Sequence, residues 1–174
     1  MTRAFFGYGS LVNSRTHDFI ATPAHLSGWR RTWCATTHRD AAFLSVDPDP
    51  DTTLMGVTAP VPGTNWADLD QREAAYDRID VSLQFSAQTV VYSVPHHSKT
   101  DLSDHSIWLS YLDVVLQGYL HVFGPDGPAH FMETTDGWEI GITDDRAVPR
   151  YPRAQSLSDD EIAMVNALTS TYWR

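Results

Sequence analysis

The chain has 174 residues, of which 42% are hydrophobic and 20% are charged, so it can bury a sizeable core and is not disordered throughout. Its formal net charge of −10 argues against nucleic acid or an anionic membrane as the main partner, because both require basic patches. The single cysteine, Cys34, excludes an intrachain disulfide and a multi-cysteine zinc site.

Neither a membrane anchor nor a secretion signal is expected from the sequence. No apolar stretch approaches the length of a membrane span, and the N-terminal segment lacks the apolar run of a signal peptide. We therefore expect a cytoplasmic protein of one domain.

The N-terminal segment predicts a strand followed by a ligand loop. The apolar run Phe5-Phe6 stops at Gly7-Tyr8-Gly9-Ser10-Leu11, where the glycines interrupt the strand pattern. Glycine lets the backbone approach a ligand closely, so the N–H groups of such a loop suit an anion.

Three further strands are predicted before residue 62. Alternating side chains over 26–37 indicate one strand, and short apolar runs at 42–46 and 54–60 indicate two more. The segment 47–51 (Asp-Pro-Asp-Pro-Asp) between them predicts an exposed loop, because proline cannot donate to a central strand.

A helix capped by Thr64 or Asn65 is predicted to run to about Arg78. Alternation over 79–85 and over 90–94 then predicts a hairpin or a bent strand, and 96–104 a polar loop. A second, buried helix is predicted from Ser106 to about Gln117, since its residues are apolar nearly all round.

The C-terminal part predicts a loop over 124–128 and a third helix. Ser158 and Glu161 have the spacing of a capping box, and apolar residues at helical period follow them. The elements together predict an α+β domain with a strand-rich first half and three helices.

Glu73 is the candidate catalytic residue that the pattern itself suggests. On a helix of about 100° per residue it lies among Trp66, Leu69 and Tyr76, where a carboxylate is costly unless it is paired, hydrogen-bonded or protonated. Burial would raise its pKa towards the range of a general acid/base at neutral pH. An ion pair with Arg72, Arg78 or another arginine, serving structure only, is the alternative.

Two motifs carry a resemblance to a known family. Tyr8-Gly9-Ser10-Leu11 resembles the substrate loop of the γ-glutamylcyclotransferase superfamily, which includes the plant AIG2-like proteins, and the segment 69–78 (LDQREAAYDR) is similar to that family's glutamate helix. Gly28-Trp29-Arg30 lies between them in the family's order. Ala74 departs from the glycine that many members have there.

The resemblance implies one domain over residues 1–174, a small mixed β-barrel or sheet with packed helices. It implies a cofactor-free and metal-free lyase that acts on a small-molecule γ-glutamyl substrate. The α-amine of the glutamyl group attacks its own γ-carbonyl carbon, 5-oxoproline forms, and an amine or amino acid is released. Glu73 would carry the proton, and Tyr8, Gly9, Ser10 and Leu11 would bind the substrate.

Other chemistries for these residues are weaker. Ser10 lacks the second glycine of a nucleophile elbow, because position 12 is valine, and the Gly7–Gly9 pair lacks the lysine of a phosphate-binding loop. Cys34 is expected to be a plain core or interface residue and not a thiol catalyst. The histidines at 96, 97 and 105 are expected to be solvated loop residues and not metal ligands.

A non-catalytic binding module on the same fold is the rival class of function. The presence of both Glu73 and the complete loop favours the enzyme, because a binder has no need of a costly glutamate. The leaving group and the oligomeric state are open at this point. The segments 96–104 and 146–153 are candidate specificity elements.

Overall fold

The computed structural model describes residues 3–37, 39–63, 66–100 and 104–174. Its main feature is a mixed six-stranded sheet in the order β4-β5-β1-β3-β2-β7. The strands are β1 (Arg3–Gly7), β2 (Thr22–Thr36), β3 (Arg39–Pro60), β4 (Asp77–Asp80), β5 (Gln88–Ser93) and β7 (Thr135–Asp136). β6 (Ile107–Trp108) and β8 (Ile142–Thr143) form a separate parallel pair.

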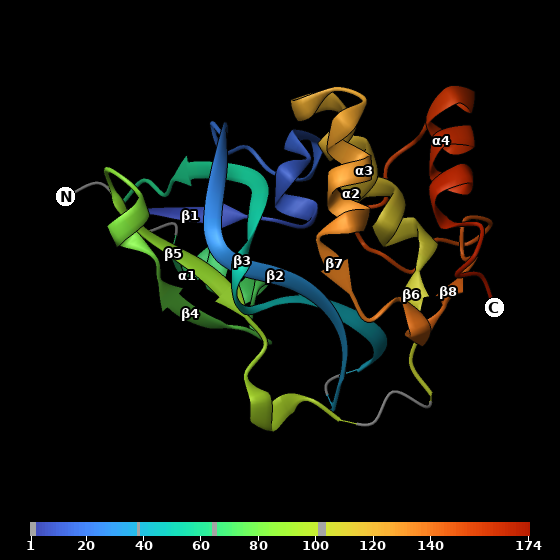
Figure 1. Ribbon diagram of the computed structural model, residues 1–174, viewed down its shortest axis with the longest axis horizontal. Helices are drawn as coiled ribbons and strands as arrows, with labels where there is room; N and C mark the ends of the chain where they lie inside the picture. The colour runs from blue at the N-terminus through green and yellow to red at the C-terminus, as the bar shows by residue number, and fades with distance from the viewer. Residues whose placement is uncertain (1–2, 38, 64–65, 101–103) are drawn as a thin grey trace.

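The helices gather beside one end of the sheet, where Figure 1 shows α2 (Leu109–Phe123), α3 (Asp126–Glu133) and α4 (Asp159–Thr169). The short α1 (Trp66–Arg72) lies apart from them, near β4 and β5. The expected α+β class with a mixed sheet is thus confirmed. No closed barrel forms within the described residues, because β4 and β7 remain the two edges of the sheet.

Two apolar clusters hold the candidate motifs in place. The larger surrounds α2 and the long β2–β3 hairpin, and the smaller contains Phe5, Leu11 and Leu69. Leu69 of α1 is 2% exposed, and Leu11 of the N-terminal loop is 7% exposed. Because the two side chains share one cluster, burial of apolar surface brings the loop and α1 together.

The expected helix up to Arg78 is wrong in its second half, and its caps Thr64 and Asn65 lie outside the described residues. α1 ends at Arg72, and the chain then turns so that Asp77–Asp80 pairs with β5. The turn also lets the Tyr76 hydroxyl donate to the Leu44 carbonyl oxygen at 3.0 Å. Tertiary hydrogen bonds thereby override the helical pattern.

The strand expected over 79–85 also ends early. The Asp80 side chain accepts a hydrogen bond from the Ser82 backbone N–H at 2.8 Å, which starts a 3-10 turn over Ser82–Gln84. Such local side-chain bonds compete with sheet pairing. Leu83, which belongs to the apolar face of the expected half-buried strand, is fully exposed.

The expected loop at 47–51 is part of the long strand β3. The pairing with β2 passes from Ser27↔Thr53 directly to Trp29↔Pro48, so four residues of β3 oppose Gly28 alone. A bulge of this kind accommodates proline without breaking the hairpin, and Gly28 has a φ of +83° there.

The helices differ from the sequence prediction in number and length. The described residues contain four, since α3 begins inside the segment 124–128 that was expected to be a loop. Proline is compatible with the start of a helix because its missing N–H needs no partner there. The predicted helix at 106 begins at Leu109, since Ile107–Trp108 pairs with β8. The capping box of Ser158 and Glu161 on α4 is confirmed.

No helix within the described residues is both long enough and apolar enough to cross a membrane.

Candidate active site

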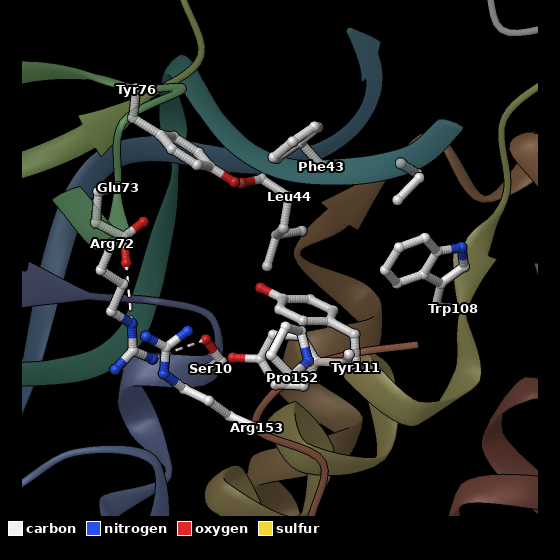
Figure 2. A pocket seen from close by; sticks show the side chains of 13 residues that line it. Ser10, Phe43, Leu44, Arg72, Glu73, Tyr76, Trp108, Tyr111, Pro152 and Arg153 are labelled. Atoms are coloured by element: carbon white, nitrogen blue, oxygen red, sulfur yellow. Dashed lines mark hydrogen bonds and ion pairs between the residues drawn. The ribbon is translucent and has the colours of Figure 1, made fainter. Parts of the chain in front are cut away.

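A cavity of about 170 Å³ lies between the N-terminal loop, β3, the end of α1, the start of α2 and the segment 151–153. Figure 2 shows the 13 side chains that line it, with Arg72 and Glu73 at one end and Trp108 at the other. A smaller adjoining hollow of about 30 Å³ is lined by the loop residues Tyr8, Gly9, Ser10 and Leu11. Glu73 and Ser10 line both spaces, so the two predicted motifs meet there.

Glu73 was expected on the apolar face of a helix, but it lies one residue beyond the end of α1. Its backbone N–H still donates to the Leu69 carbonyl oxygen at 2.9 Å, which continues the helical hydrogen bonding to this residue. The side chain is 16% exposed, and its Oε1 lies 3.3 Å from Arg72 Nε. Burial raises the pKa of Glu73, while the guanidinium groups of Arg72 and Arg153 act to lower it.

Arg72 joins the glutamate to the N-terminal loop. Its guanidinium donates to the Thr16 carbonyl oxygen at 3.0 Å and to the hydroxyl oxygens of Ser10 and Thr16 at 3.2 Å each. Arg72 therefore does two things: it balances the charge of Glu73 and it holds the loop against α1. Arg78, the other partner considered for Glu73, pairs with Asp70 instead.

Gly9 is a loop position at which a side chain would displace a neighbour. A Cβ placed there would lie 2.7 Å from the Tyr111 hydroxyl oxygen and 3.2 Å from Leu44 Cδ2. The 3-10 turn Ser10–Val12 begins directly after it, with the Val12 N–H donating to the Gly9 carbonyl oxygen at 3.0 Å. The absent side chain thus leaves room for Tyr111 against the loop.

A buried arginine fixes the peptide before Gly9. Arg31 is fully buried, and its Nε donates to the Tyr8 carbonyl oxygen at 3.0 Å, to which the Tyr119 hydroxyl also donates at 2.9 Å. Arg31 also donates to the Met55 carbonyl oxygen and the Thr134 hydroxyl, both at 2.6 Å. In a trans peptide C=O and N–H point in opposite directions, so these donors turn the Gly9 N–H away from the core.

Tyr8, Tyr76 and Tyr111 line the smaller hollow together with Glu73. Tyr8 donates to the Tyr92 carbonyl oxygen at 2.6 Å, and Tyr76 donates to that of Leu44. Burial raises the pKa of Tyr8, Tyr76 and Tyr111, and the charge of Glu73 adds to the effect in each case. The three phenols are therefore neutral at physiological pH.

The loop residues of the sequence prediction have different positions at the site. Ser10 lines the main cavity, whereas Tyr8, Gly9 and Leu11 line only the smaller hollow. The Tyr8 hydroxyl is engaged with backbone carbonyls, and Leu11 packs in the second apolar cluster. The two motifs are brought together, but what each residue does for a ligand stays a prediction.

Arg72 was named from the sequence only as an ion-pair partner of Glu73, and no role at the site was assigned to several other residues of this cavity. Tyr76 and Arg72 belong to the segment 69–78 that contains Glu73, so this motif could have identified them as site residues. Arg153 belongs to the segment 146–153, which was named as a specificity element. The aromatic residues Trp108 and Tyr111 were expected to belong to the core, but both line the cavity. The β3 residues gave no signal, because their approach depends on tertiary packing.

The other segments flagged from sequence lie elsewhere. None of the described residues of 96–104 lines the cavity. Within the part of the chain that is described, no group of three or more His, Cys, Asp or Glu side chains has the arrangement of a metal site. His96 and His97 are exposed as expected, whereas His105 is only partly exposed: its Nε2 lies 3.0 Å from the Thr36 carbonyl oxygen and its Nδ1 is buried.

Cys34 is buried at 6% exposure, and burial raises its pKa to about 11. Its thiol is therefore protonated at neutral pH. This agrees with the expected core residue.

Comparisons with known proteins bear on the fold. No family model matches the sequence, and no curated protein matches it. Among solved structures, a γ-glutamyl cyclotransferase is similar with a TM-score of 0.61 at 13% identity, over 96% of this chain and 99% of that one. YkqA from Bacillus subtilis has a TM-score of 0.57 at 16% identity, over 78% of this chain and 56% of YkqA.

An uncharacterized protein from Homo sapiens is also similar, with a TM-score of 0.55 at 11% identity over 94% of this chain and 97% of that one. The three likenesses define the class: this is an α+β protein with the γ-glutamyl cyclotransferase-like fold. The resemblance drawn from the two sequence motifs is confirmed at the level of the fold.

Proposed function

We propose that the protein is a γ-glutamylcyclotransferase-type enzyme, acting as a single domain over residues 1–174, with Glu73 as its general acid/base. The observation that carries the proposal is a largely buried carboxylate of raised pKa, which lines one cavity together with two arginines and the glycine loop. The fold is that of a solved γ-glutamyl cyclotransferase, which supports the same reading.

The charges of the cavity match a γ-glutamyl head group. Its lining contains two guanidinium groups, Arg72 and Arg153, and one carboxylate, Glu73. The head group has one α-carboxylate and one α-ammonium. The arginines would attract the carboxylate, and Glu73 would accept a proton from the ammonium, since a raised pKa brings the glutamate closer to the amine it must deprotonate.

The reaction needs no group beyond these. A new bond forms between the α-nitrogen and the γ-carbonyl carbon, and the amide bond from that carbon to the leaving nitrogen breaks. The α-nitrogen gives up two protons, and the leaving nitrogen gains two. One carboxylate can carry both in turn, because the two nitrogens meet at the same carbon.

The cavity would also supply orientation and charge stabilisation. A bent glutamyl chain held for ring closure can gain an effective molarity of roughly 10⁵ M or more. The N–H of Gly9, directed away from Arg31, and the small hollow beside it suit an oxygen that develops negative charge. Tyr8, Ser10 and Leu11 would shape this second space.

The test is 5-oxoproline release from a panel of γ-glutamyl compounds by the wild type and by Glu73→Gln. We expect the variant to lose about 10³-fold or more in kcat, as removal of a general acid/base does, while keeping its fold and its affinity for substrate. Glu139→Gln is the matched control, because Glu139 is exposed and lies outside the cavity, so the same change should leave turnover intact.

Binding of a γ-glutamyl compound without turnover by the wild type would instead identify a binding module on this fold. Undiminished turnover in Glu73→Gln would reject Glu73 as the acid/base.

A further inference from the structure

The two ends of the cavity differ in chemistry. All three charged side chains of its lining, Arg72, Glu73 and Arg153, belong to one end, and the charges of both arginines act on Glu73. In Figure 2 the side chain of Arg153 extends towards Arg72 and Ser10, and Trp108 closes the opposite end. A substrate with charges at one end only would match this division.

The second end offers apolar and aromatic surface. It contains Trp108 ahead of α2 together with Ala41 and Ala42 of β3, since the Ala42 N–H donates to the carbonyl oxygen of Ser106, two residues before Trp108. Phe43 and Tyr151 also line the cavity. Tyr151 packs edge-on against Tyr111, with ring centroids 5.0 Å apart. None of these side chains carries a charge, and Arg150, whose guanidinium lies 5.8 Å from the Trp108 ring centroid, is not part of the lining.

This division determines where the parts of a substrate fit. Under the proposed function the α-amine must reach Glu73, which places the α-carboxylate near the two arginines. The leaving group then extends towards Trp108. A carboxylate on the leaving group would meet no cation among the side chains that line this end, which is unfavourable compared with an apolar group.

We infer that the substrate is a γ-glutamyl amide whose leaving amine has an aromatic or apolar substituent without a charged group. A γ-glutamyl peptide, whose leaving group ends in a carboxylate, is not the substrate. Aromatic leaving groups gain most, because an edge-to-face contact with Trp108 adds to the burial of apolar surface. The inference rests on the proposed function and adds the substrate class to it.

The decisive comparison is between γ-glutamyl-phenethylamide and γ-glutamyl-phenylalanine, which differ only by the carboxylate of the leaving amine. We expect kcat/KM for 5-oxoproline release to be higher for the amide by about 10-fold or more, the factor that corresponds to about 1.4 kcal/mol. Glutathione, whose leaving dipeptide also carries a carboxylate, should be turned over as poorly as γ-glutamyl-phenylalanine.

A positive charge introduced at the apolar end should change the ratio of kcat/KM for γ-glutamyl-phenethylamide to that for γ-glutamyl-phenylalanine. In Ala42→Arg the new guanidinium would face the leaving group, and we expect the preference to narrow or reverse in favour of the carboxylate. Ala167→Arg adds the same charge at an exposed position of α4 outside the cavity, and it should leave the ratio unchanged.

The outcomes separate the two proposals. Release of 5-oxoproline with equal or better use of γ-glutamyl-phenylalanine by the wild type would overturn the substrate class and leave the reaction standing. No release from any of the three compounds would overturn the proposed reaction itself. The ratio of kcat/KM measured for the wild type tests the substrate class even if Ala42→Arg does not fold.

Discussion

Replacing Arg72 by methionine should weaken the fold and shift the pH dependence of activity together. Methionine keeps much of the apolar stem but removes the three hydrogen bonds to Ser10 and Thr16 and the contact with Glu73. The Arg72 side chain is 10% exposed, so solvent replaces these bonds poorly.

At about 1 kcal/mol for each hydrogen bond, Arg72→Met should lower the free energy of unfolding by about 3 kcal/mol. For a chain of this length that corresponds to a fall in Tm of roughly 6–12 °C. Thermal and urea unfolding of the variant and the wild type measure both quantities.

The pH dependence follows from the sign of the pKa shift. Folding raises the pKa of Glu73, so the stability that this group contributes is fully present below its unfolded pKa and is lost as pH rises through the folded value. Arg72 is the largest influence that lowers this pKa, so its removal should raise the pKa further. The stability difference between variant and wild type should therefore widen as pH rises from about 4 to 7.

Activity should respond in the same direction. Because Glu73 must be deprotonated to act as a base, the acidic limb of the kcat/KM profile should move to higher pH in Arg72→Met. Arg78→Met is the matched control: its ion pair with Asp70 is about 40% exposed, so we expect a loss of about 1 kcal/mol or less and an unmoved acidic limb. An unmoved limb together with a constant stability difference in Arg72→Met would refute the coupling between Arg72 and Glu73.

Three further predictions concern other parts of the molecule. Gly9→Ala should reduce kcat/KM by at least about 10-fold, because the new Cβ displaces the Tyr111 hydroxyl, and full activity in this variant would contradict the close packing described for the loop. Ser158→Ala should lower the free energy of unfolding by about 1 kcal/mol, measured in urea, because the N-cap hydrogen bond from the Glu161 N–H is lost, and turnover should not change. An unchanged unfolding midpoint would show that this cap does not stabilise the protein. Cys34, buried with a pKa raised to about 11, should resist thiol reagents at pH 7.5 until the protein is unfolded, and rapid stoichiometric labelling of the native protein would show the thiol to be accessible.

Local signals identified the elements whose causes are local. The capping box at Ser158 marks the start of α4, because both of its hydrogen bonds span only three residues. The loop at 8–11 and the glutamate at 73 were likewise recognised from short motifs, and the structure brings both to one cavity.

Elements whose limits depend on distant partners were predicted less well. The helical pattern continued past Arg72, but pairing with β5 ended the helix there. Pro48 and Pro50 indicated a loop, yet the opposing strand β2 holds their segment in a bulged hairpin. In each case the chain's own pattern was outweighed by hydrogen bonds to another segment.

The sequence by itself therefore determined the class of fold, the loop and the carboxylate around which the candidate site is built. Only the tertiary structure decided that Arg31 lies beneath the loop, that Arg153 approaches Glu73 from 80 positions along the chain, and that Trp108 closes an apolar end. Periodicity and capping act over a few residues, whereas a cavity is defined by side chains whose separation in sequence leaves no local trace.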